Sequence, residues 1–327
     1  MATFSVIKLS GLTPIHIGTG RESYDFSAAD LCSDTLSAAL AATMAMWGEA
    51  TDIQSFLGAI RLSSAFPYYK NHLFLPVPKG RINVEIKGED ASLYRKSLKK
   101  VRYIELPLWQ QLINGEKLSI ERNQINGEFI MVPSTQLPNS IYESEVKERV
   151  SVSRDESKDS EPFFFEWRFF DKDAGLFVLT ESEGENLQKV VDLFEALGEQ
   201  GIGTDKSVGG GKFEVSLDKT IEIGCTEEKH ACMLLSLYLP TAEEMSTIDL
   251  EASRYSIILR GGYMAGSEKE EFRHLRKKSV YMMDVGSVLK TDTSLEGKVV
   301  DLRPEWNDNA MHPAFRSGRA LSIPIKL

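Results

Sequence analysis

The sequence predicts an α+β protein with two tandem ferredoxin-like (RRM-like) domains, each with the element order βαββαβ. Two segments far apart in the chain, 33–48 and about 185–199, carry apolar side chains at helical spacing. Short apolar stretches typical of strands flank both segments, and the last third of the chain is rich in such stretches but poor in helix. The length of 327 residues is enough for about two domains.

The first domain is predicted over residues 1–218. Ser33 or Asp34 can cap the first helix, because a short side-chain oxygen accepts a hydrogen bond from a free backbone N–H of the first turn. The second helix ends at Gly198 and Gly201. The strands expected in this domain lie near 4–10, 60–62, 66–69, 73–77, 163–170, 176–179 and 212–216.

A large insertion is predicted at about 79–160, where polar and charged residues give no regular pattern. Residues 81–102 within it contain seven basic side chains against three acidic ones. Segment 143–161 combines a strand-like stretch with a charged turn, which favours a protruding hairpin or a mobile loop. The following segment, 163–170 (FFFEWRFF), is interpreted as a buried strand paired with 176–179.

The second domain is predicted over residues 219–327, as a degenerate version of the same fold. A short turn or helix is expected at 241–244. The expected strands lie at 232–239, 255–260, 280–285, 298–302 and 320–325.

Composition excludes several classes of protein. The 38 basic and 48 acidic side chains give a net charge of −10, which argues against a general polyelectrolyte binder but leaves room for a local basic groove. No apolar run reaches the ~18 residues that span a bilayer, and no signal peptide is recognised. Three cysteines indicate a reduced, cytoplasmic protein. Cys225, His230 and Cys232 lack a second ligand pair, so no metal is expected.

The most informative segment is the loop 201–211, in which five of eleven residues are glycine. Glycines allow the backbone N–H groups to approach a phosphodiester, and Lys206, Ser207 and Lys212 add charge and a hydroxyl. The loop is not a Walker motif, because Phe213 follows Lys212 and the loop comes after a helix. A flexible linker between helix and strand is the alternative.

Two further segments contain candidate RNA contacts. In the loop 16–21 (HIGTGR), His16 could act as a general base, bind or stack on a nucleobase, or simply be packed in the loop. Near the C-terminus, Arg316 and Arg319 flank a glycine, and Arg260 lies at a strand end. These arginines suit phosphate, although solvated loops would look the same.

Together, the segments HIGTG (16–20), CSDTLSAAL (32–40), GIGTDKSVGGGKF (201–213) and HPAFRSGRALSIPI (312–325) resemble the RAMP superfamily of type III-A CRISPR effectors. Within it they are most similar to the Csm subunit that caps the 5′ end of the guide RNA. That resemblance implies a non-catalytic scaffold without cofactor or metal, which grips the repeat-derived 5′ tag and carries a thumb hairpin in its insertion, most plausibly around 143–161.

The resemblance also implies partners and site residues. The partners would be the guide RNA, a large polymerase-like subunit, an adjacent RAMP backbone subunit, and target RNA reached through the guide; no membrane is involved. The guide contacts carried over are His16, Gly18, Gly20, Arg21, Ser33, Lys206, Ser207, Gly209, Gly210 and Gly211 with the adjoining Lys212, and more weakly Arg260, Arg316 and Arg319.

Two other functions remain open on the sequence. One is a metal-independent endoribonuclease of the same superfamily, with His16 as general base and Lys206 or Arg21 stabilising the charge of the phosphorane. The other is a ligand-binding protein unrelated to RNA, for which no salt-dependent RNA affinity is expected.

Overall fold

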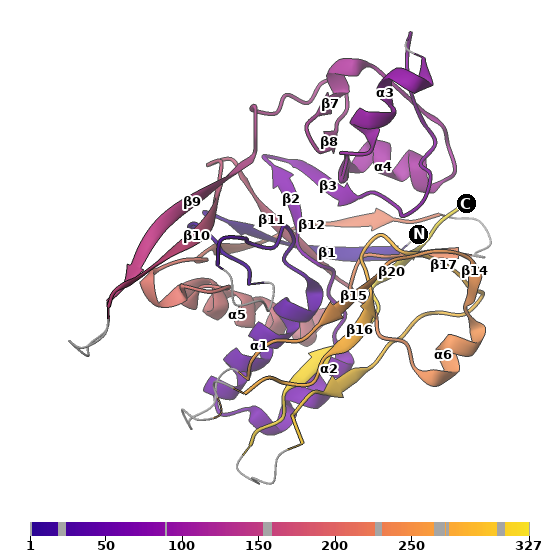
Figure 1. The fold of residues 1–327 in the computed structure, drawn as a ribbon. Helices are drawn as coiled ribbons and strands as arrows, with labels where there is room; N and C mark the ends of the chain where they lie inside the picture. The colour runs from indigo at the N-terminus through magenta and orange to yellow at the C-terminus, as the bar shows by residue number, and fades with distance from the viewer. Residues whose placement is uncertain are drawn as a thin grey trace.

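The computed structural model is a mixed α+β structure, as the sequence predicts (Figure 1). It describes residues 2–18, 24–88, 90–152, 159–225, 231–264, 272, 275–305 and 311–326. Helices α1 (Ser33–Met46), α2 (Ile53–Ala59) and α5 (Gly184–Gln200) lie together on one side of the main sheet. Both long helices predicted from apolar periodicity, α1 and α5, are therefore confirmed.

Residues 2–225, here called the first half although they are about two thirds of the chain, contain four antiparallel strands in the order β12-β1-β11-β2; residues 231–326 are called the second half. Numbered along the chain, this order is 4-1-3-2, with α1 after the first strand and α5 after the third. The central strand β1 is buried on both faces: Phe4 and Val6 face one apolar core, and Ile7 and Leu9 face the other, under the helices. The bounds are β1 (Ala2–Ser10), β2 (Phe66–Tyr69), β11 (Ala174–Thr180) and β12 (Glu214–Ile223).

The domain boundary predicted at 218 falls inside a strand, because β12 continues to Ile223 along β1. The second half then forms its own sheet in the order β14-β17-β13-β20, which is again 4-1-3-2 when read from its other edge. Helix α6 (Ala242–Thr247) follows the first of these strands. The strands are β13 (Ala231–Leu234), β14 (Asp249–Arg254), β17 (Val288–Lys290) and β20 (Ser322–Pro324).

Two small ribbons complete the second half. One pairs β15 (Ile257–Arg260) with β16 (Val280–Met283), and the other pairs β18 (Val299–Asp301) with β19 (Phe315–Ser317). The described residues between β17 and β20 contain this second ribbon and no helix.

The predicted insertion is more regular than its composition suggests. Residues 70–141, here called the insertion lobe, extend the main sheet and fold around the fully buried Trp109, whose indole N–H donates to the Pro76 carbonyl at 2.7 Å. The elements are β3 (His72–Pro76), β4 (Val84–Ile86), α3 (Ala91–Leu98), β5 (Tyr103–Glu105), α4 (Leu106–Ile113), β6 (Leu118–Ile120), β7 (Ile125–Asn126) and β8 (Phe129–Ile130).

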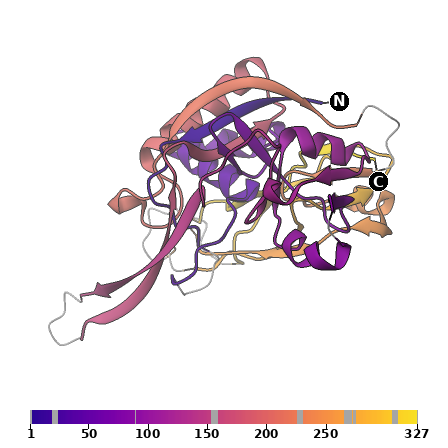
Figure 2. The same cartoon turned by 90° about the horizontal axis from the view of Figure 1, so that it is seen from above.

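A long hairpin projects from the body of the molecule (Figures 1 and 2). It pairs β9 (Tyr142–Ser151) with β10 (Glu161–Phe170) in one continuous antiparallel register; the tip, 153–158, lies outside the described residues. The strand predicted at 163–170 forms as part of β10, but the prediction that it is buried and paired with 176–179 was wrong. Only Phe165 and Trp167 of β10 are buried, and β11 pairs with β1 and β2 instead.

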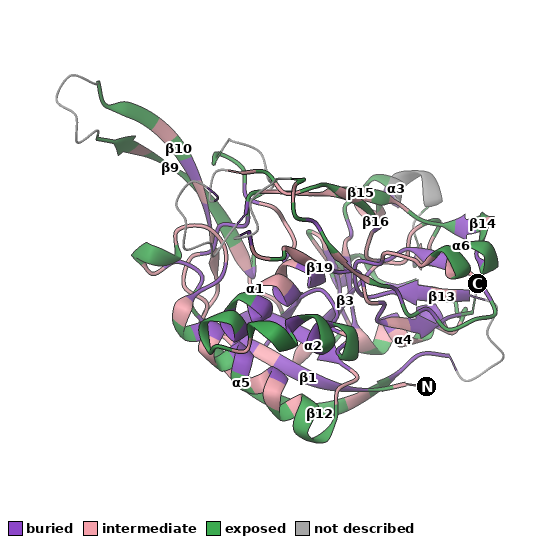
Figure 3. Cartoon of the chain, turned by 90° about the horizontal axis from the view of Figure 1, so that it is seen from below, coloured by how far each residue is buried: buried purple, intermediate pink, exposed green. Residues whose placement is uncertain are grey.

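The two halves share one apolar core. Side chains of β1 and β11 pack in the same cluster as those of β13 and β20, and the burial pattern is continuous across both sheets, while the hairpin is largely exposed (Figure 3). A polar connection between the two halves lies at the start of α1. Ser33 Oγ accepts from the backbone N–H of Leu237 at 2.9 Å, and the Ser33 backbone N–H donates to Ser64 Oγ at 3.0 Å.

A buried ionic cluster stands beside this connection. The Asp34 carboxylate is fully buried and accepts from Arg260 Nε at 2.8 Å and Arg260 Nη2 at 3.0 Å, and also from Arg316 Nη1. Burial lowers the pKa of Arg316 to about 10, so its guanidinium is charged at neutral pH. The predicted capping role of Ser33 or Asp34 was wrong: the N-cap is Cys32, and both side chains bind the second half of the chain.

We predict that Asp34→Ala lowers the free energy of unfolding by about 3–5 kcal/mol, because it leaves the buried guanidinium of Arg316 without its anion. Urea unfolding followed by circular dichroism measures the change. Glu195→Ala, on the exposed face of α5, is the matched loss of an acid and should change stability by less than about 0.5 kcal/mol. Equal stabilities of the two variants would contradict this role of Asp34.

Candidate nucleic-acid interface

Residues 12–18, here called the strap, connect β1 to the loop that precedes α1 and lie between two other segments. On one side, Ile15 and Arg168 of β10 exchange backbone hydrogen bonds of 3.0 and 2.9 Å. On the other side, the His16 carbonyl accepts from Thr204 N at 3.0 Å, and the Pro14 carbonyl accepts from Gly211 N at 2.9 Å. The structure therefore brings the strap, the loop 201–211 and the base of the hairpin together.

Most glycines of the loop 201–211, the glycine loop, are required by this packing. Gly203 has φ +97°, and a Cβ there would overlap the carbonyl oxygen of His16. A Cβ on Gly210 would lie 2.7 Å from the Trp167 ring. Gly209, with φ +87°, is the exception, because it has open space around it. The loop is thus a fitted element rather than a flexible linker.

The expected cradle of glycine N–H groups does not form in this arrangement. The N–H groups of Gly209 and Gly210 donate within the loop, to the carbonyls of Lys206 and Asp205 at 3.1 and 3.2 Å, and that of Gly211 donates to the strap. The exposed groups of the loop are the side chains of Lys206 and Ser207 on the short 3-10 turn Lys206–Val208, with Lys212 beyond it. Within the described residues, these three side chains have no recorded hydrogen-bond or ion-pair partner.

His16 is packed inside the interface, with 1% of its surface exposed. Its Nδ1 lies 2.8 Å from the carbonyl of Glu166 and donates to it, and its ring packs against Phe165 in a tilted arrangement, with centroids 4.5 Å apart. Nε2 is buried without a partner among the described residues. In this position the imidazole orders the strap and has no access to a ribose hydroxyl in solvent.

The hairpin is also tied to the glycine loop by charge, through a residue near the tip end of β9. Arg149 of β9 forms an ion pair with Asp205, and its guanidinium lies 4.5 Å from the Phe165 ring centroid and 5.3 Å from that of Trp167. This contact fixes the direction in which the hairpin leaves the body.

Exposed aromatic side chains border the interface, and sequence reasoning did not select them. Tyr24 is 47% exposed and stacks on Phe165 at 5.9 Å, and its carbonyl accepts from the Glu166 N–H at 3.0 Å. Phe26 and Phe164 are 60% and 56% exposed. The available signal was the position of Tyr24 and Phe26 shortly after the loop 16–21, which was already selected for its glycines.

The remaining predicted residues lie apart from this interface or are engaged within the chain. Ser33, Arg260 and Arg316 belong to the Asp34 cluster, so Ser33 and Arg316 are buried. Arg319 donates from Nη2 to Glu296 Oε2 at 2.8 Å and from Nη1 to the Gly297 carbonyl at 3.1 Å. Gly18 ends the strap beside Thr204. Gly20 and Arg21 lie outside the described residues.

The described residues contain no cluster of three or more His, Cys, Asp or Glu side chains arranged to hold a metal ion. In the same part of the chain, none of the helices combines the length and apolar character needed to cross a bilayer.

The sequence is similar to proteins of one family. The profile of the family described as "CRISPR Csm4 C-terminal domain" matches residues 227–325. The protein named "CRISPR system Cms protein Csm4" from Mycobacterium tuberculosis (strain CDC 1551 / Oshkosh) is 21% identical over 267 residues, which cover 81% of this chain and 80% of that protein. The protein of the same name from Thermococcus onnurineus (strain NA1) is 23% identical over 255 residues, with 76% and 78% covered.

Solved structures have the same fold. The Csm3-Csm4 subcomplex of the type III-A CRISPR-Cas interference complex contains a chain that matches with a TM-score of 0.63 and 15% identity, covering 99% of this chain and 100% of that one. A chain of the Csm1-Csm4 cassette in complex with cA4 matches with a TM-score of 0.62 and 19% identity, covering 99% and 98%.

We predict that Gly203→Ala destabilises the protein more than Gly209→Ala does. Both positions have positive φ, so both variants carry a backbone cost of about 1 kcal/mol. Only the Gly203 methyl would also displace the strap, which adds about 1–3 kcal/mol. Urea midpoints measure the difference, and equal midpoints would mean that the strap does not constrain the glycine loop.

Proposed function

Because this chain belongs to the Csm4 family of type III-A CRISPR RAMP proteins, we propose that it is an RNA-binding subunit of an RNA-guided interference complex and holds the repeat-derived 5′ tag of the guide. The observation that carries the RNA part of the proposal is the meeting of the strap, the glycine loop and the hairpin base. There, free cations and exposed aromatic rings lie on one rigid support.

The contacts would come from side chains rather than from backbone N–H groups. Lys206 and Lys212 would neutralise phosphates, and the Ser207 hydroxyl would donate to a phosphate oxygen. Tyr24 and Phe26 offer faces on which unpaired bases stack, as is usual for single-stranded RNA. Contacts from a few side chains are compatible with the net negative charge of the protein. A local group of cations can attract RNA even though the rest of the surface repels it.

The partners are inferred from the assemblies of similar proteins. Csm4 chains are found with Csm1 in one solved structure and with Csm3 in another. We infer that this chain likewise bridges a large polymerase-like subunit and the adjacent RAMP backbone subunit, and reaches target RNA only through base pairing with the guide.

Two finer points of architecture belong to the same proposal. The 4-1-3-2 strand order in both halves supports a tandem of ferredoxin-like domains, the second lacking a described helix between its third and fourth strands. The hairpin β9–β10 is proposed as the thumb. It contains Glu143, Glu145 and Glu148, which suit the separation of bases better than the holding of phosphates.

A scaffold role is better supported than RNA cleavage. A general base must lie within hydrogen-bond reach of the proton that it removes. His16 Nδ1 is bound to the chain and Nε2 is enclosed, so the group assigned to the alternative enzyme has no route to substrate here.

We predict that the double variant Lys206→Ala/Lys212→Ala weakens the binding of repeat-derived single-stranded RNA and reduces the slope of log K against log salt by about 0.7 for each lost phosphate contact. Fluorescence anisotropy across a salt series measures both quantities. Lys219→Ala, an exposed lysine on β12, is the control and should leave the slope unchanged. The assignment of the glycine loop fails if the double variant behaves like the control.

We also predict that affinity-tagged protein, purified from its native cells, brings with it short RNAs that share one repeat-derived 5′ end, together with a large polymerase-like protein. RNA sequencing and mass spectrometry identify both. Purification without RNA and without partner proteins would overturn the proposed role as a complex subunit.

A further inference from the structure

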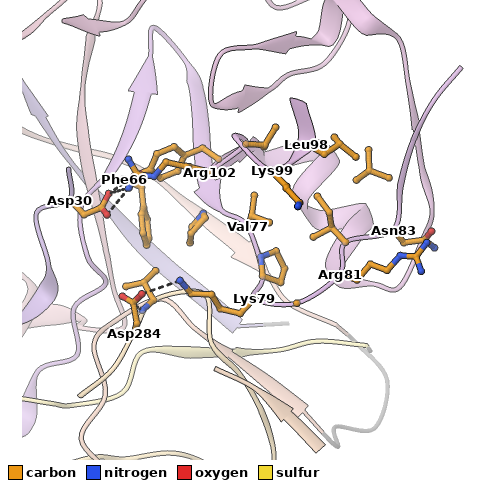
Figure 4. Close-up of a pocket in the computed structure, with 18 of the residues that line it drawn as sticks. Asp30, Phe66, Val77, Lys79, Arg81, Asn83, Leu98, Lys99, Arg102 and Asp284 are labelled. Carbon is orange, nitrogen blue, oxygen red and sulfur yellow. Dashed lines mark hydrogen bonds and ion pairs between the residues drawn. The ribbon is translucent and has the colours of Figure 1, made fainter. Parts of the chain in front are cut away.

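A cavity of about 940 Å³ lies between the insertion lobe, the main sheet and the second half of the chain (Figure 4). The lobe contributes its β4 and α3 side, the main sheet contributes Phe66, and the turn after β16 contributes Asp284 and Val285. The volume is in the range of small-molecule and nucleotide sites. The cavity is separate from the interface around the strap, since no residue of 12–18 or 201–212 lines it.

The charged side chains of the cavity wall are not balanced. Three of the five basic residues have an acidic partner within the wall: Lys79 Nζ lies 3.0 Å from Asp284, Arg102 Nη2 lies 2.5 Å from Asp30, and Lys117 pairs with Glu85. The other two, Arg81 and Lys99, are exposed, and in the described part of the chain neither has a recorded partner. The wall thus has a surplus of two positive charges.

The remainder of the wall is apolar. Phe66, Val77, Leu98 and Val101 face the cavity together with the ring of Tyr103. Figure 4 shows the Lys99 ammonium directed toward the space bordered by Val77, with Arg81 at the outer end of the cavity. An apolar cavity with two unpaired cations, Arg81 and Lys99, at its border fits a planar aromatic ring that has an anionic group on either side.

We propose that this cavity takes one unstacked nucleotide of single-stranded RNA, with its base between the apolar walls and its two flanking phosphodiesters at Arg81 and Lys99. One nucleotide within a strand carries two singly charged phosphodiesters, which matches the surplus of two cations. The inference rests on the proposed RNA-binding function but locates a second contact, on the insertion lobe, that the glycine loops do not provide.

The test compares two double variants of the full-length chain by anisotropy with a short 3′-labelled single-stranded RNA. Arg81→Ala/Lys99→Ala removes the two free cations. Lys87→Ala/Lys100→Ala removes two exposed lysines of the same lobe that do not line the cavity. We expect the first pair to weaken binding by about tenfold or more and to reduce the salt slope by about 1.4, and the control pair to change neither.

Two further measurements locate the base. RNA containing 4-thiouridine should crosslink to a peptide of the insertion lobe, and the crosslink should be lost in Arg81→Ala/Lys99→Ala. Adenosine monophosphate should compete only weakly, because its single terminal phosphate cannot replace two phosphodiesters placed at Arg81 and at Lys99. If the monophosphate alone occupies the cavity and RNA does not, the site belongs to a free nucleotide and the proposal is overturned.

The outcomes separate this proposal from the function on which it rests. If Arg81→Ala/Lys99→Ala binds RNA like the control while Lys206→Ala/Lys212→Ala is weakened, the cavity site is wrong and the RNA-binding function stands. If the wild-type chain binds no RNA, both are wrong. If the cavity variant keeps its RNA affinity but loses a co-purifying protein, the free cations bind an acidic partner segment, which also overturns the proposal.

Discussion

The buried carboxylate of Asp34 holds the two halves of this protein in one arrangement. A charge removed from water is stable only with partners of opposite charge, and here both partners, Arg260 and Arg316, come from the second half. Since Asp34 lies in the first turn of α1, the pairing fixes the end of the helix that follows the strap. The orientation of α1 on the sheet, and with it the position of the glycine-rich interface, depends on this cluster.

The interface follows the same rule that buried polar groups must find partners. The strap carbonyls accept from the glycine loop, and the His16 ring donates to β10. The hydrogen-bonding groups of the strap backbone are therefore largely paired within the protein. What remains for a ligand is a set of long side chains and rings on the outside. Under the proposed function, such a surface would bind RNA through charge and stacking, which tolerate many sequences, and would leave sequence discrimination to pairing between nucleotides.

The sequence was informative where structure depends on local pattern. Apolar periodicity located α1 and α5. The glycine-rich loop was singled out as a phosphate cradle, whereas its glycines serve packing, as Gly203 does against the strap. Long-range pairing could not be predicted in this way. Arg316 and Asp34 are separated by 282 positions, so an arginine that the sequence suggested was available to phosphate is in fact enclosed.

The burial of the aromatic segment of β10 was predicted wrongly for a related reason. Its composition is that of a core strand, but its apolar side chains alternate between the body and the exposed face of a hairpin, and only Phe165 and Trp167 point inward enough to be buried. The regular structure of the insertion lobe was not predicted because its strands are short. Its one usable signal was the excess of basic residues over 81–102, which includes Arg81, Lys99 and the paired Arg102 of the cavity wall.

The separation in sequence between Asp34 and its two arginines also affects how the protein is made. On the ribosome, the carboxylate emerges 226 positions before Arg260 and 282 before Arg316. Whereas many chains complete an N-terminal domain early in synthesis, the first helix of this one reaches its final packing only after Arg316 has been made. A product that ends before Arg260 therefore lacks both cations that Asp34 needs in order to be buried.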